Sequence, residues 1–338
     1  MHCPRLKHFI RLQPSGKIGK CGHMTKSKEF DTLDALESST WLKNIKDQMS
    51  KNIWPTECRR CEQTEKVMQD SIRIKSIKRH KLLYPKNKQY LVVGGVLDNI
   101  CNSACQTCNS KLSTKIGSLH GKQYLRFNNL EQFWKLPHDR IVEVDINGGE
   151  PTASKNYREM LDSLRDTVRI VRINTNGSRI IPEIEQLLQQ KTMVIVTMSF
   201  DGVDNVHDYV RWPIKFKNFK KTLKYYKTLQ KKYKLLKLNF WTTVSVYNVG
   251  DFENIHNFAK QNKIDHHWAF LNNPDVLNVK YKNNFTLVAK KILKNKAMAD
   301  QIAIGKNNQT NLELYIMKQD FLRKIHIEDY FNLEPKNS

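Results

Sequence analysis

The sequence contains no long hydrophobic run. Across its 338 residues no apolar stretch approaches the ~18 residues that a membrane-spanning helix needs, so we expect no membrane span. The first residues, Met1-His-Cys-Pro-Arg-Leu-Lys, are basic and lack the apolar core of a secretory signal. Hydrophobic residues make up only 39%, but they are well segregated into runs. This length and pattern predict one large domain with a buried core, or one large and one small domain.

Acidic residues are scarce relative to basic ones. Lys and Arg number 57 against 33 Asp and Glu, which gives a net charge of +24. A field of this sign attracts phosphates and acidic partners. The excess is mostly lysine spread along helical stretches such as residues 215–237, which is typical of a solvated surface. Nucleic acid is therefore a possible but less favoured partner.

The seven cysteines occur in a chain without a recognisable secretory signal. Thiols in a reducing compartment serve as ligands more often than as disulfides. We therefore expect a cytoplasmic protein whose cysteines bind metal.

Three of the cysteines form a C-x3-C-x2-C triplet, Cys101-Asn-Ser-Ala-Cys105-Gln-Thr-Cys108, directly after the apolar run 90–97. On a loop, this spacing can reach three corners of one iron–sulfur cube and leave the fourth iron open to a small molecule. Zinc sites more often use C-x2-C or Cys/His pairs closed to four ligands. The triplet by itself favours an iron–sulfur cluster over zinc or over a chance run of buried thiols.

From residue 90 onward, apolar runs alternate with helical patterns. Near-continuous apolar strands with helical crossovers are typical of an α/β fold built on a parallel sheet. Six such units predict a partial (β/α)6 barrel, two units short of a closed eight-fold barrel. The expected strands are 90–97, 141–146, 169–173, 193–198, 238–246 and 267–271, and the expected helices are 130–136, 157–165, 181–190, 218–233 and 252–262.

Residues 1–85 form a small cysteine-bearing α+β segment with little core of its own. A hairpin is expected over residues 9–21 with its turn at 14–16, and a helix over about 32–49. Segments of this size are usually stabilised by a metal or a cluster. The candidate ligands are Cys3, Cys21, Cys58 and Cys61, and from the residues alone a structural zinc and an iron–sulfur cluster are equally favoured.

The predicted strands end in polar residues. The second ends in Asn147-Gly148-Gly149-Glu150-Pro151, where paired glycines let a ligand approach the backbone and a carboxylate can hold an ammonium group. The third ends at Asn174-Thr-Asn-Gly and the fourth at Ser199-Phe-Asp201-Gly, with a hydroxyl and a carboxylate suited to a ribose. Each could be an ordinary turn. Chemistry in parallel α/β barrels gathers at these strand ends, so the set predicts a cofactor site.

At these residues the chain resembles the radical S-adenosylmethionine (SAM) enzymes. The cysteine triplet matches the family's C-x3-C-x2-C, Gly148 to Pro151 match its Gly-Gly-Glu-Pro, and residues 199–202 match its ribose-binding strand. Thr107 departs from the family, in which the residue before the third cysteine is often bulky and contacts adenine. The resemblance implies a 4Fe–4S cluster on the three cysteines and SAM held by Gly148, Gly149, Glu150, Asn174, Ser199 and Asp201. The segment 207–213 also resembles one in members with auxiliary clusters, which implies that Arg211 holds the SAM carboxylate.

The N-terminal segment resembles the twitch half of the SPASM/twitch auxiliary-cluster module. The spacing Cys3, Gly16-x4-Cys21 and Cys58-x2-Cys61 carries the resemblance, in an N-terminal position as in a phage- and bacteria-associated subgroup. It implies a second iron–sulfur cluster on the four cysteines. We therefore expect a twitch-like segment over 1–85, a radical SAM partial barrel over 86–278 and a helical extension over 279–338.

The resemblance implies an enzyme that cleaves SAM reductively, with an electron from a flavodoxin or ferredoxin. The 5′-deoxyadenosyl radical would abstract a hydrogen from a peptide or small-molecule substrate, in an oxidation or other modification. The alternative is a non-catalytic nucleic-acid-binding protein with structural zinc sites. It predicts aromatic residues among the basic ones, and Phe216, Phe219, Tyr225 and Tyr226 do lie among lysines. Their helical spacing favours a stripe that faces the core.

Overall fold

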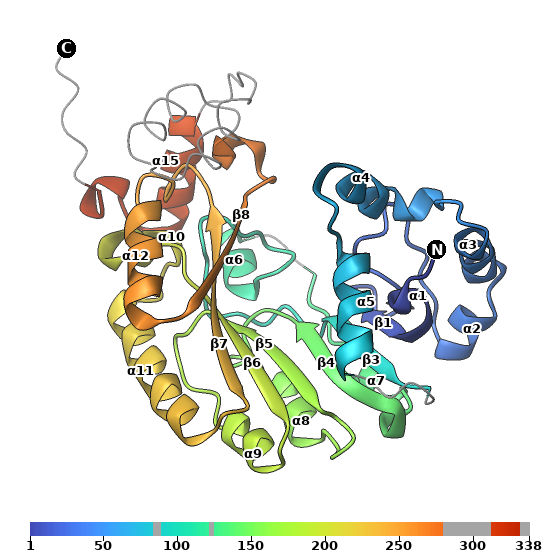
Figure 1. The fold of residues 1–338 in the computed structure, drawn as a ribbon. Coiled ribbons are helices and arrows are strands. Elements are labelled where there is room, and N and C mark those ends of the chain that lie inside the picture. Colours follow the sequence, from blue (N-terminus) through green and yellow to red (C-terminus); the bar gives the residue numbers. More distant parts are fainter. Residues whose placement is uncertain (84–88, 122–124, 280–311, 332–338) are drawn as a thin grey trace.

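An open, curved sheet of eight strands organises the protein (Figure 1). The structure is a computed structural model and describes residues 1–83, 89–121, 125–279 and 312–331. The strand order is β2-β1-β3-β4-β5-β6-β7-β8, and all neighbours are parallel except the hairpin pair β1 and β2. The strands are β1 (Phe9–Leu12), β2 (Ile18–Gly19), β3 (Leu91–Val96), β4 (Ile141–Asn147), β5 (Ile170–Thr175), β6 (Met193–Ser199), β7 (Leu236–Val244) and β8 (Asp265–Phe270).

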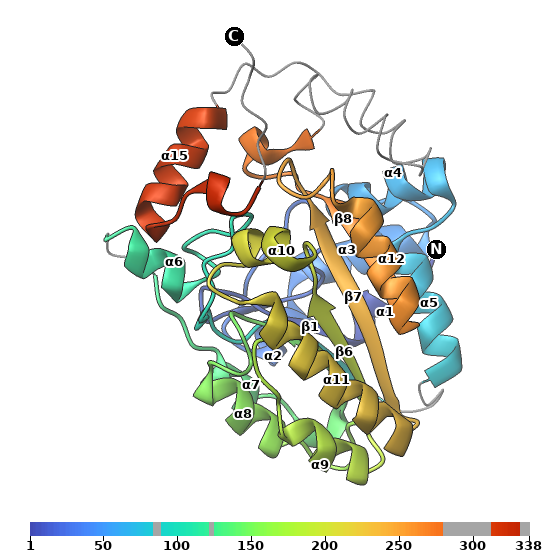
Figure 2. The same ribbon diagram turned by 90° about the vertical axis from the view of Figure 1, so that its left-hand side faces the viewer.

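Helices cover the outer face of the sheet, as the two views show (Figures 1 and 2). Alternate residues of each strand point to this face, and they join the helices in one large hydrophobic core. From the central strands, this core includes Val93, Val144, Ile146, Val171, Ile173, Val194, Val196 and Phe240. The helices that follow strands β4 to β7 are α8 (Lys155–Asp162), α9 (Glu183–Gln189), α10 (Asp204–Val210), α11 (Phe216–Lys232) and α12 (Phe252–Asn262), and α7 (Leu130–Trp134) precedes β4.

The opposite face of the sheet is polar, and we name it the pocket face. It is the face on which Asn147, Asn174 and Ser199 lie, at the carboxyl ends of three neighbouring strands. Along β8 the residues of this face are exposed, whereas their neighbours are half-buried. The predicted α/β fold with a partly closed, six-unit parallel barrel is confirmed, since β3 to β8 are all parallel.

The N-terminal segment contributes strands to the same sheet. The predicted hairpin forms, with Arg11 opposite Gly19, but β1 also pairs in parallel with β3 over four residue pairs. Gly95 makes this pairing possible, because its φ is +103° and a Cβ there would lie 2.2 Å from the Leu12 carbonyl oxygen. Leu12 and its neighbours therefore belong to the main core rather than to a core of the segment's own.

The prediction of a single helix over about residues 32–49 is wrong. Two helices occupy the stretch, α2 (Leu33–Ser38) and α3 (Thr40–Ser50). The break falls at Ser39, whose hydroxyl accepts a hydrogen bond from the Leu42 amide and so caps α3. The remaining N-terminal helices are α1 (Pro4–His8), α4 (Arg59–Met68) and α5 (Ile72–Leu83), and the 3-10 turn η1 covers Thr56–Cys58.

Two helices lie near the carboxyl ends of the strands. Helix α6 (Thr114–Leu119) follows the cysteine triplet, and α15 (Leu312–Arg323) extends the helical stretch predicted from Leu312. Residues 280–311 of the predicted helical extension lie outside the described residues. Within the described ranges, no helix combines the length and apolar character that crossing a membrane requires.

Candidate active site

A cavity of about 310 Å³ opens where strands β3 to β7 end. The three cysteines of the triplet enter it from the loop after β3, and polar side chains enter it from the ends of the next strands. The residues that line it are Cys101, Ser103, Cys105, Thr107, Cys108, Leu112, Asn147, Gly148, Gly149, Glu150, Asn174, Thr175, Asn176, Ser199, Arg211 and Thr243. Of the predicted barrel site residues, all but Asp201 lie on its wall.

Backbone hydrogen bonds hold the cysteine loop against the end of α10 and the residues that follow it. The Ala104 amide donates to the Trp212 carbonyl at 2.7 Å, and the Gln106 amide donates to the Val210 carbonyl at 2.9 Å. Cys105 is buried, while Cys101 and Cys108 are partly open to the cavity. The irregular backbone of this loop is thus fixed by two partners from another part of the chain.

Burial holds the three thiols in their neutral form. It raises the pKa of Cys101 to about 12 and that of Cys108 to about 11, and it also raises the pKa of Cys105. Neighbouring thiols add to the shift, because two thiolates in one small space repel each other. Thiols of this kind lose their protons when a metal group binds, since the cation stabilises the thiolate.

Arg323 of α15 supports the same loop, and the sequence analysis missed it. Its Nε donates to the Ala104 carbonyl at 2.8 Å and its Nη2 to the Cys105 carbonyl at 3.4 Å. The side chain is only 4% exposed. Arg323 lies more than two hundred positions from the triplet in a stretch without a motif, so no sequence signal marks it.

The Gly148-Gly149-Glu150 loop packs against the chain that leads into the triplet. A Cβ at Gly149 would lie 2.0 Å from the Ile100 carbonyl oxygen, and the Glu150 amide donates to that same oxygen at 2.8 Å. Position 149 therefore requires a glycine because a side chain there would collide with the backbone at Ile100. The close approach couples the loop to the first cysteine.

The Glu150 carboxylate is buried and bonded within the protein. It accepts hydrogen bonds from the Thr175 hydroxyl at 2.7 Å, the Asn176 amide at 2.6 Å, and the hydroxyl and amide of Thr152. Burial raises its pKa, and these hydrogen bonds act against the shift. Glu150 therefore joins the ends of β4 and β5 into one rigid wall.

Asn176 connects this wall to the cysteine loop. Its side-chain amide donates to the Asn102 side chain at 2.8 Å and to the Ser103 hydroxyl at 2.7 Å. On the neighbouring positions, Asn174 is exposed to the cavity and donates to the Asn147 side chain. The sequence marked residues 174–177 only as a polar strand end, and the structure gives Asn176 its partners.

Arg211 enters the cavity beside the cysteines. Its Nη1 donates to the Asp201 carboxylate at 3.0 Å, and the other Asp201 oxygen accepts from the Thr243 amide at 2.7 Å. Asp201 is 1% exposed and lies behind the wall, while Ser199 faces the cavity. The structure thus separates the two predicted ribose ligands: Ser199 is accessible, and Asp201 orients Arg211.

The donor set fits a cluster with a bound amino acid. Three thiols converge on one side of the cavity, and the buried Nε of Arg211 has no hydrogen-bond partner among the described residues. An unpartnered guanidinium nitrogen of this kind matches a ligand carboxylate. Hydroxyl and amide groups at Ser199 and Asn174 complete a polar wall for a nucleoside.

The other four cysteines meet in the N-terminal segment. Cys3, Cys21, Cys58 and Cys61 line one pocket together with Arg5, whose Nε donates to the Cys21 sulfur at 3.2 Å. Burial raises the pKa of Cys3 to about 11 and that of Cys58 to about 12. All seven cysteines are free thiols. In the described part of the chain, no three His, Cys, Asp or Glu side chains form a group that could hold a single metal ion.

The fold is thus an open parallel α/β barrel with three cysteines and a polar cavity at its strand ends. Residues 96–259 match the family model of the "Radical SAM superfamily". These residues are therefore a radical SAM domain. The cofactors of the family are a 4Fe–4S cluster and SAM.

Several characterised relatives match part of the chain. The sporulation killing factor maturation protein SkfB of Bacillus subtilis is 29% identical over 119 residues, which cover 34% of this chain and 27% of SkfB. The mycofactocin maturase MftC of Mycolicibacterium smegmatis is 33% identical over 116 residues, which cover 33% of this chain and 28% of MftC. The chain thus matches less than a third of either relative's length.

Among solved structures, Streptococcus suis SuiB bound to S-adenosylmethionine resembles this chain. The superposition covers 94% of this chain and 70% of SuiB, with 15% sequence identity and a TM-score of 0.44.

Proposed function

We propose that the chain is an enzyme that cleaves SAM reductively and uses the product to modify a peptide. The observation that carries the proposal is the meeting of Cys101, Cys105 and Cys108 in one cavity with Arg211, whose Nε has no hydrogen-bond partner among the described residues. When bound and reduced, the cluster and SAM supply a 5′-deoxyadenosyl radical that removes a hydrogen atom from a substrate. The rest of the chemistry depends on how the chain positions these groups.

Each wall of the cavity has a proposed part. The three cysteines of the triplet hold the cluster. Arg211, which Asp201 orients, binds the SAM carboxylate. The backbone of Gly148 and Gly149 binds the SAM amino group. Glu150 keeps that backbone in place through its four hydrogen bonds. Ser199 and Asn174 bind the ribose.

A peptide is the substrate class that the comparisons favour. SkfB is named for the maturation of a sporulation killing factor, and MftC is named a mycofactocin maturase. We extend maturation chemistry to this chain, with a modification or oxidation as the reaction. Because the cleavage consumes an electron, a flavodoxin- or ferredoxin-type protein is the proposed donor.

We further propose that residues 1–85 hold a second, auxiliary iron–sulfur cluster on Cys3, Cys21, Cys58 and Cys61. The supporting observation is that four thiols line one pocket: Cys3 precedes α1, Cys21 follows the hairpin, and Cys58 and Cys61 lie in η1 and α4. Residues 86–278 then form the catalytic barrel, and the rest of the chain a C-terminal extension. Four ligands close a cube, so this cluster would transfer electrons or fix the segment to the barrel.

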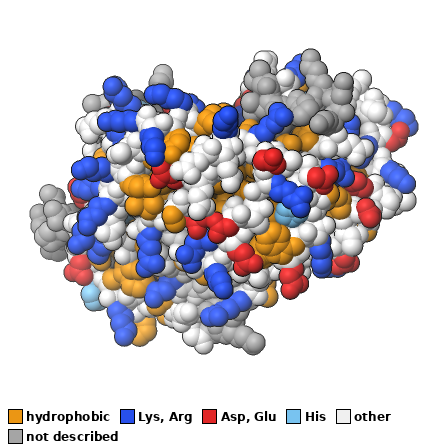
Figure 3. Space-filling view, turned by 90° about the horizontal axis from the view of Figure 1, so that it is seen from below, with side chains coloured by type: hydrophobic (Ala, Val, Ile, Leu, Met, Phe, Trp, Pro, Cys, Tyr) orange, Lys and Arg blue, Asp and Glu red, His pale blue; other side chains and the backbone are white. Residues whose placement is uncertain are grey.

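The alternative, a nucleic-acid-binding protein with structural zinc, has less support. On the face seen in Figure 3, Lys and Arg side chains are interspersed with acidic and hydrophobic ones. The aromatic residues Phe216, Phe219 and Tyr226 are buried in the core, so they offer no stacking surface.

The proposal is tested with protein reconstituted with iron and sulfide under anaerobic conditions and reduced with dithionite. We expect wild type to convert SAM to 5′-deoxyadenosine and methionine, and Cys105→Ala to lose this activity entirely. Cys105→Ala removes a cluster ligand without adding bulk to the buried loop. Equal product from the two proteins, measured by chromatography, would refute the assignment of the triplet.

A further inference from the structure

Two arginines share one buried carboxylate on the pocket face. Arg79 Nη1 and Arg172 Nε both donate to the same oxygen of Glu143, Oε1, each at 2.8 Å. The Glu143 side chain is 0% exposed, whereas those of Arg79 and Arg172 are 31% and 24% exposed. One carboxylate compensates only one of the two positive charges.

The neighbouring charges leave this excess in place. Asp145 lies on the same face two residues along β4, and its charge acts on Arg79. Arg5, whose charge also acts on Arg79, adds a further positive charge. The local sum is three arginines against two carboxylates.

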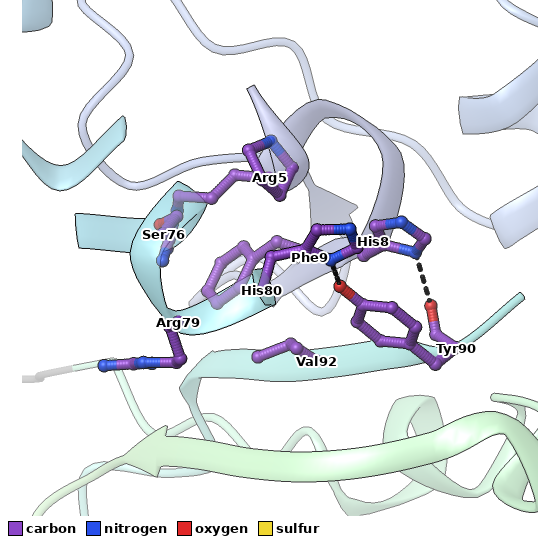
Figure 4. Close-up of a pocket in the computed structure, with 9 residues that line it drawn as sticks. Arg5, His8, Phe9, Ser76, Arg79, His80, Tyr90 and Val92 are labelled. Atoms are coloured by element: carbon purple, nitrogen blue, oxygen red, sulfur yellow. Dashed lines mark hydrogen bonds between the residues drawn. The ribbon is translucent and has the colours of Figure 1, made fainter. Parts of the chain in front are cut away.

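Arg172 has donors to spare. Only its Nε makes a hydrogen bond within the described residues; Nη1 and Nη2 have none there. Arg79 approaches from α5, and Figure 4 shows its guanidinium extending away from the His8, His80 and Tyr90 rings of the adjoining pocket. The arginine pair thus presents the planar, paired N–H groups that recognise a carboxylate.

The pair lies on the same sheet face as the SAM cavity. Asn147 and Asn174 line the cavity, and alternate residues of a strand share one face. Arg172 is two residues before Asn174 on β5, and Glu143 is four residues before Asn147 on β4. At about 3.3 Å per residue, the arginines lie roughly 7 to 13 Å below the cavity.

The surface beyond the pair is open. Trp241, directly opposite Ser199 in the sheet, is 41% exposed, and Lys237 on the same strand is exposed as well. The face therefore offers a polar surface with an exposed aromatic ring on which an extended peptide can lie.

We propose that Arg172 and Arg79 bind a carboxylate of the peptide substrate. The acidic side chain then lies two to four residues from the residue that is modified at the cavity, since an extended chain also advances about 3.3 Å per residue. This inference rests on the proposed function, because it assumes a substrate between the arginine pair and the SAM cavity. It assigns the substrate class as an acidic peptide.

The test uses the reconstituted protein with SAM and two fluorescein-labelled decapeptides, one of alternating Glu and Ala and one of alternating Gln and Ala. Fluorescence anisotropy gives the two dissociation constants. We expect wild type to bind the Glu peptide roughly tenfold more tightly, the size of effect typical of one charge-assisted hydrogen bond. Arg172→Gln should abolish this preference, whereas Lys231→Gln on α11 removes an equal charge from an exposed surface site and should leave the preference intact.

Glu143→Gln gives a prediction of opposite sign. It keeps the shape of the side chain but removes the charge that offsets the arginines, so binding of the Glu peptide should tighten severalfold. A merely structural role would predict weaker or unchanged binding. Circular dichroism of each variant confirms that it folds.

Two results overturn the inference. One is a Glu-peptide affinity that Arg172→Gln does not change, or that Glu143→Gln weakens or leaves unchanged. The other is tighter binding of a labelled single-stranded RNA decamer with the same dependence on Arg172, which would make the pair a phosphate site. Cleavage of SAM in the same preparations, measured without peptide, shows separately whether the proposed function stands.

Discussion

Glu150 belongs to a motif associated with cofactor binding, but its carboxylate is hydrogen-bonded to other groups of the protein. Its two carboxylate oxygens face four donors, among them two backbone amides that cannot turn away. A glutamine can offer an oxygen to only one side. Its amide nitrogen then faces a donor, which leaves a buried group unsatisfied at a cost of about 1–3 kcal/mol.

We therefore predict that Glu150→Gln weakens SAM binding by about 1.5–3 kcal/mol and also lowers the free energy of unfolding by about 2 kcal/mol. Calorimetry with SAM and urea titration give the two quantities. Glu159→Gln, on the exposed side of α8, is the matched control. Unchanged SAM affinity would show that the Glu150 carboxylate has no part in shaping the site.

His207 of α10 is fully buried where this helix packs against α11. Its ring contacts those of Phe200, Phe216 and Phe219 and is 0% exposed. Burial, with a further contribution from Arg211, lowers its pKa to about 3. The folded protein therefore keeps this ring neutral, while the unfolded chain binds a proton near pH 6.5.

The sign of the pH effect follows from this difference. The stabilisation is fully present above pH 6.5 and is lost as the pH falls toward 3, at about 1.4 kcal/mol per pH unit. Between pH 6.5 and 5 we expect a loss of about 2 kcal/mol that His207→Phe removes. Urea titrations at several pH values measure it, with the exposed His267→Phe as control. An equal slope in wild type and His207→Phe would contradict the prediction.

At the scale of elements, α15 stabilises the cysteine loop from outside the barrel. Arg323 is fixed by Gln319 one turn earlier and reaches the carbonyls of Ala104 and Cys105. On the same helix, Asp320 accepts a hydrogen bond from the Tyr209 hydroxyl at 2.8 Å. The C-terminal helix thus contacts both the cluster loop and α10.

Arg323→Met should preserve the packing of the stem and remove the hydrogen bonds to the loop. We expect the reconstituted variant to release iron to a chelator severalfold faster than wild type, since the Ala104 carbonyl loses its partner. Lys318→Met, at an exposed position of α15, should behave as wild type. Identical release rates for Arg323→Met and wild type would show that α15 does not stabilise the cysteine loop.

At the scale of the whole molecule, one sheet joins the two groups of cysteines. The parallel pairing of β1 with β3 places the N-terminal thiols and the barrel in one framework. Arg5 contacts Cys21 and also stacks over the Phe9 ring at 3.5 Å, on the strand that pairs with β3. The proposed auxiliary cluster is therefore connected to the barrel by packed side chains.

We predict that the double change Cys58→Ala, Cys61→Ala removes about half of the iron and leaves SAM cleavage largely intact, because the two cysteine sets are separate. Turnover of the substrate should be lost. Mössbauer spectra with iron and zinc analysis of both proteins measure this. The outcome that contradicts the prediction is a wild type with one cluster and one zinc, and a double variant that lacks the zinc. The N-terminal cysteines would then bind a structural zinc instead of an auxiliary cluster.

The sequence by itself determined the fold class and marked most of the residues that meet in the central cavity. Apolar runs that alternate with helical patterns predict buried parallel strands without knowledge of which strands pair. The cysteine triplet and Gly148-Gly149-Glu150 are made of residues close together in the chain, so they can be recognised from the sequence. Only the tertiary structure decided what depends on distant contacts. It joined β1 to β3, placed Asp201 behind Arg211, and brought Arg323 to the loop and Arg79 to Glu143. These pairings depend on packing between segments far apart in sequence, and no local pattern of residues encodes them.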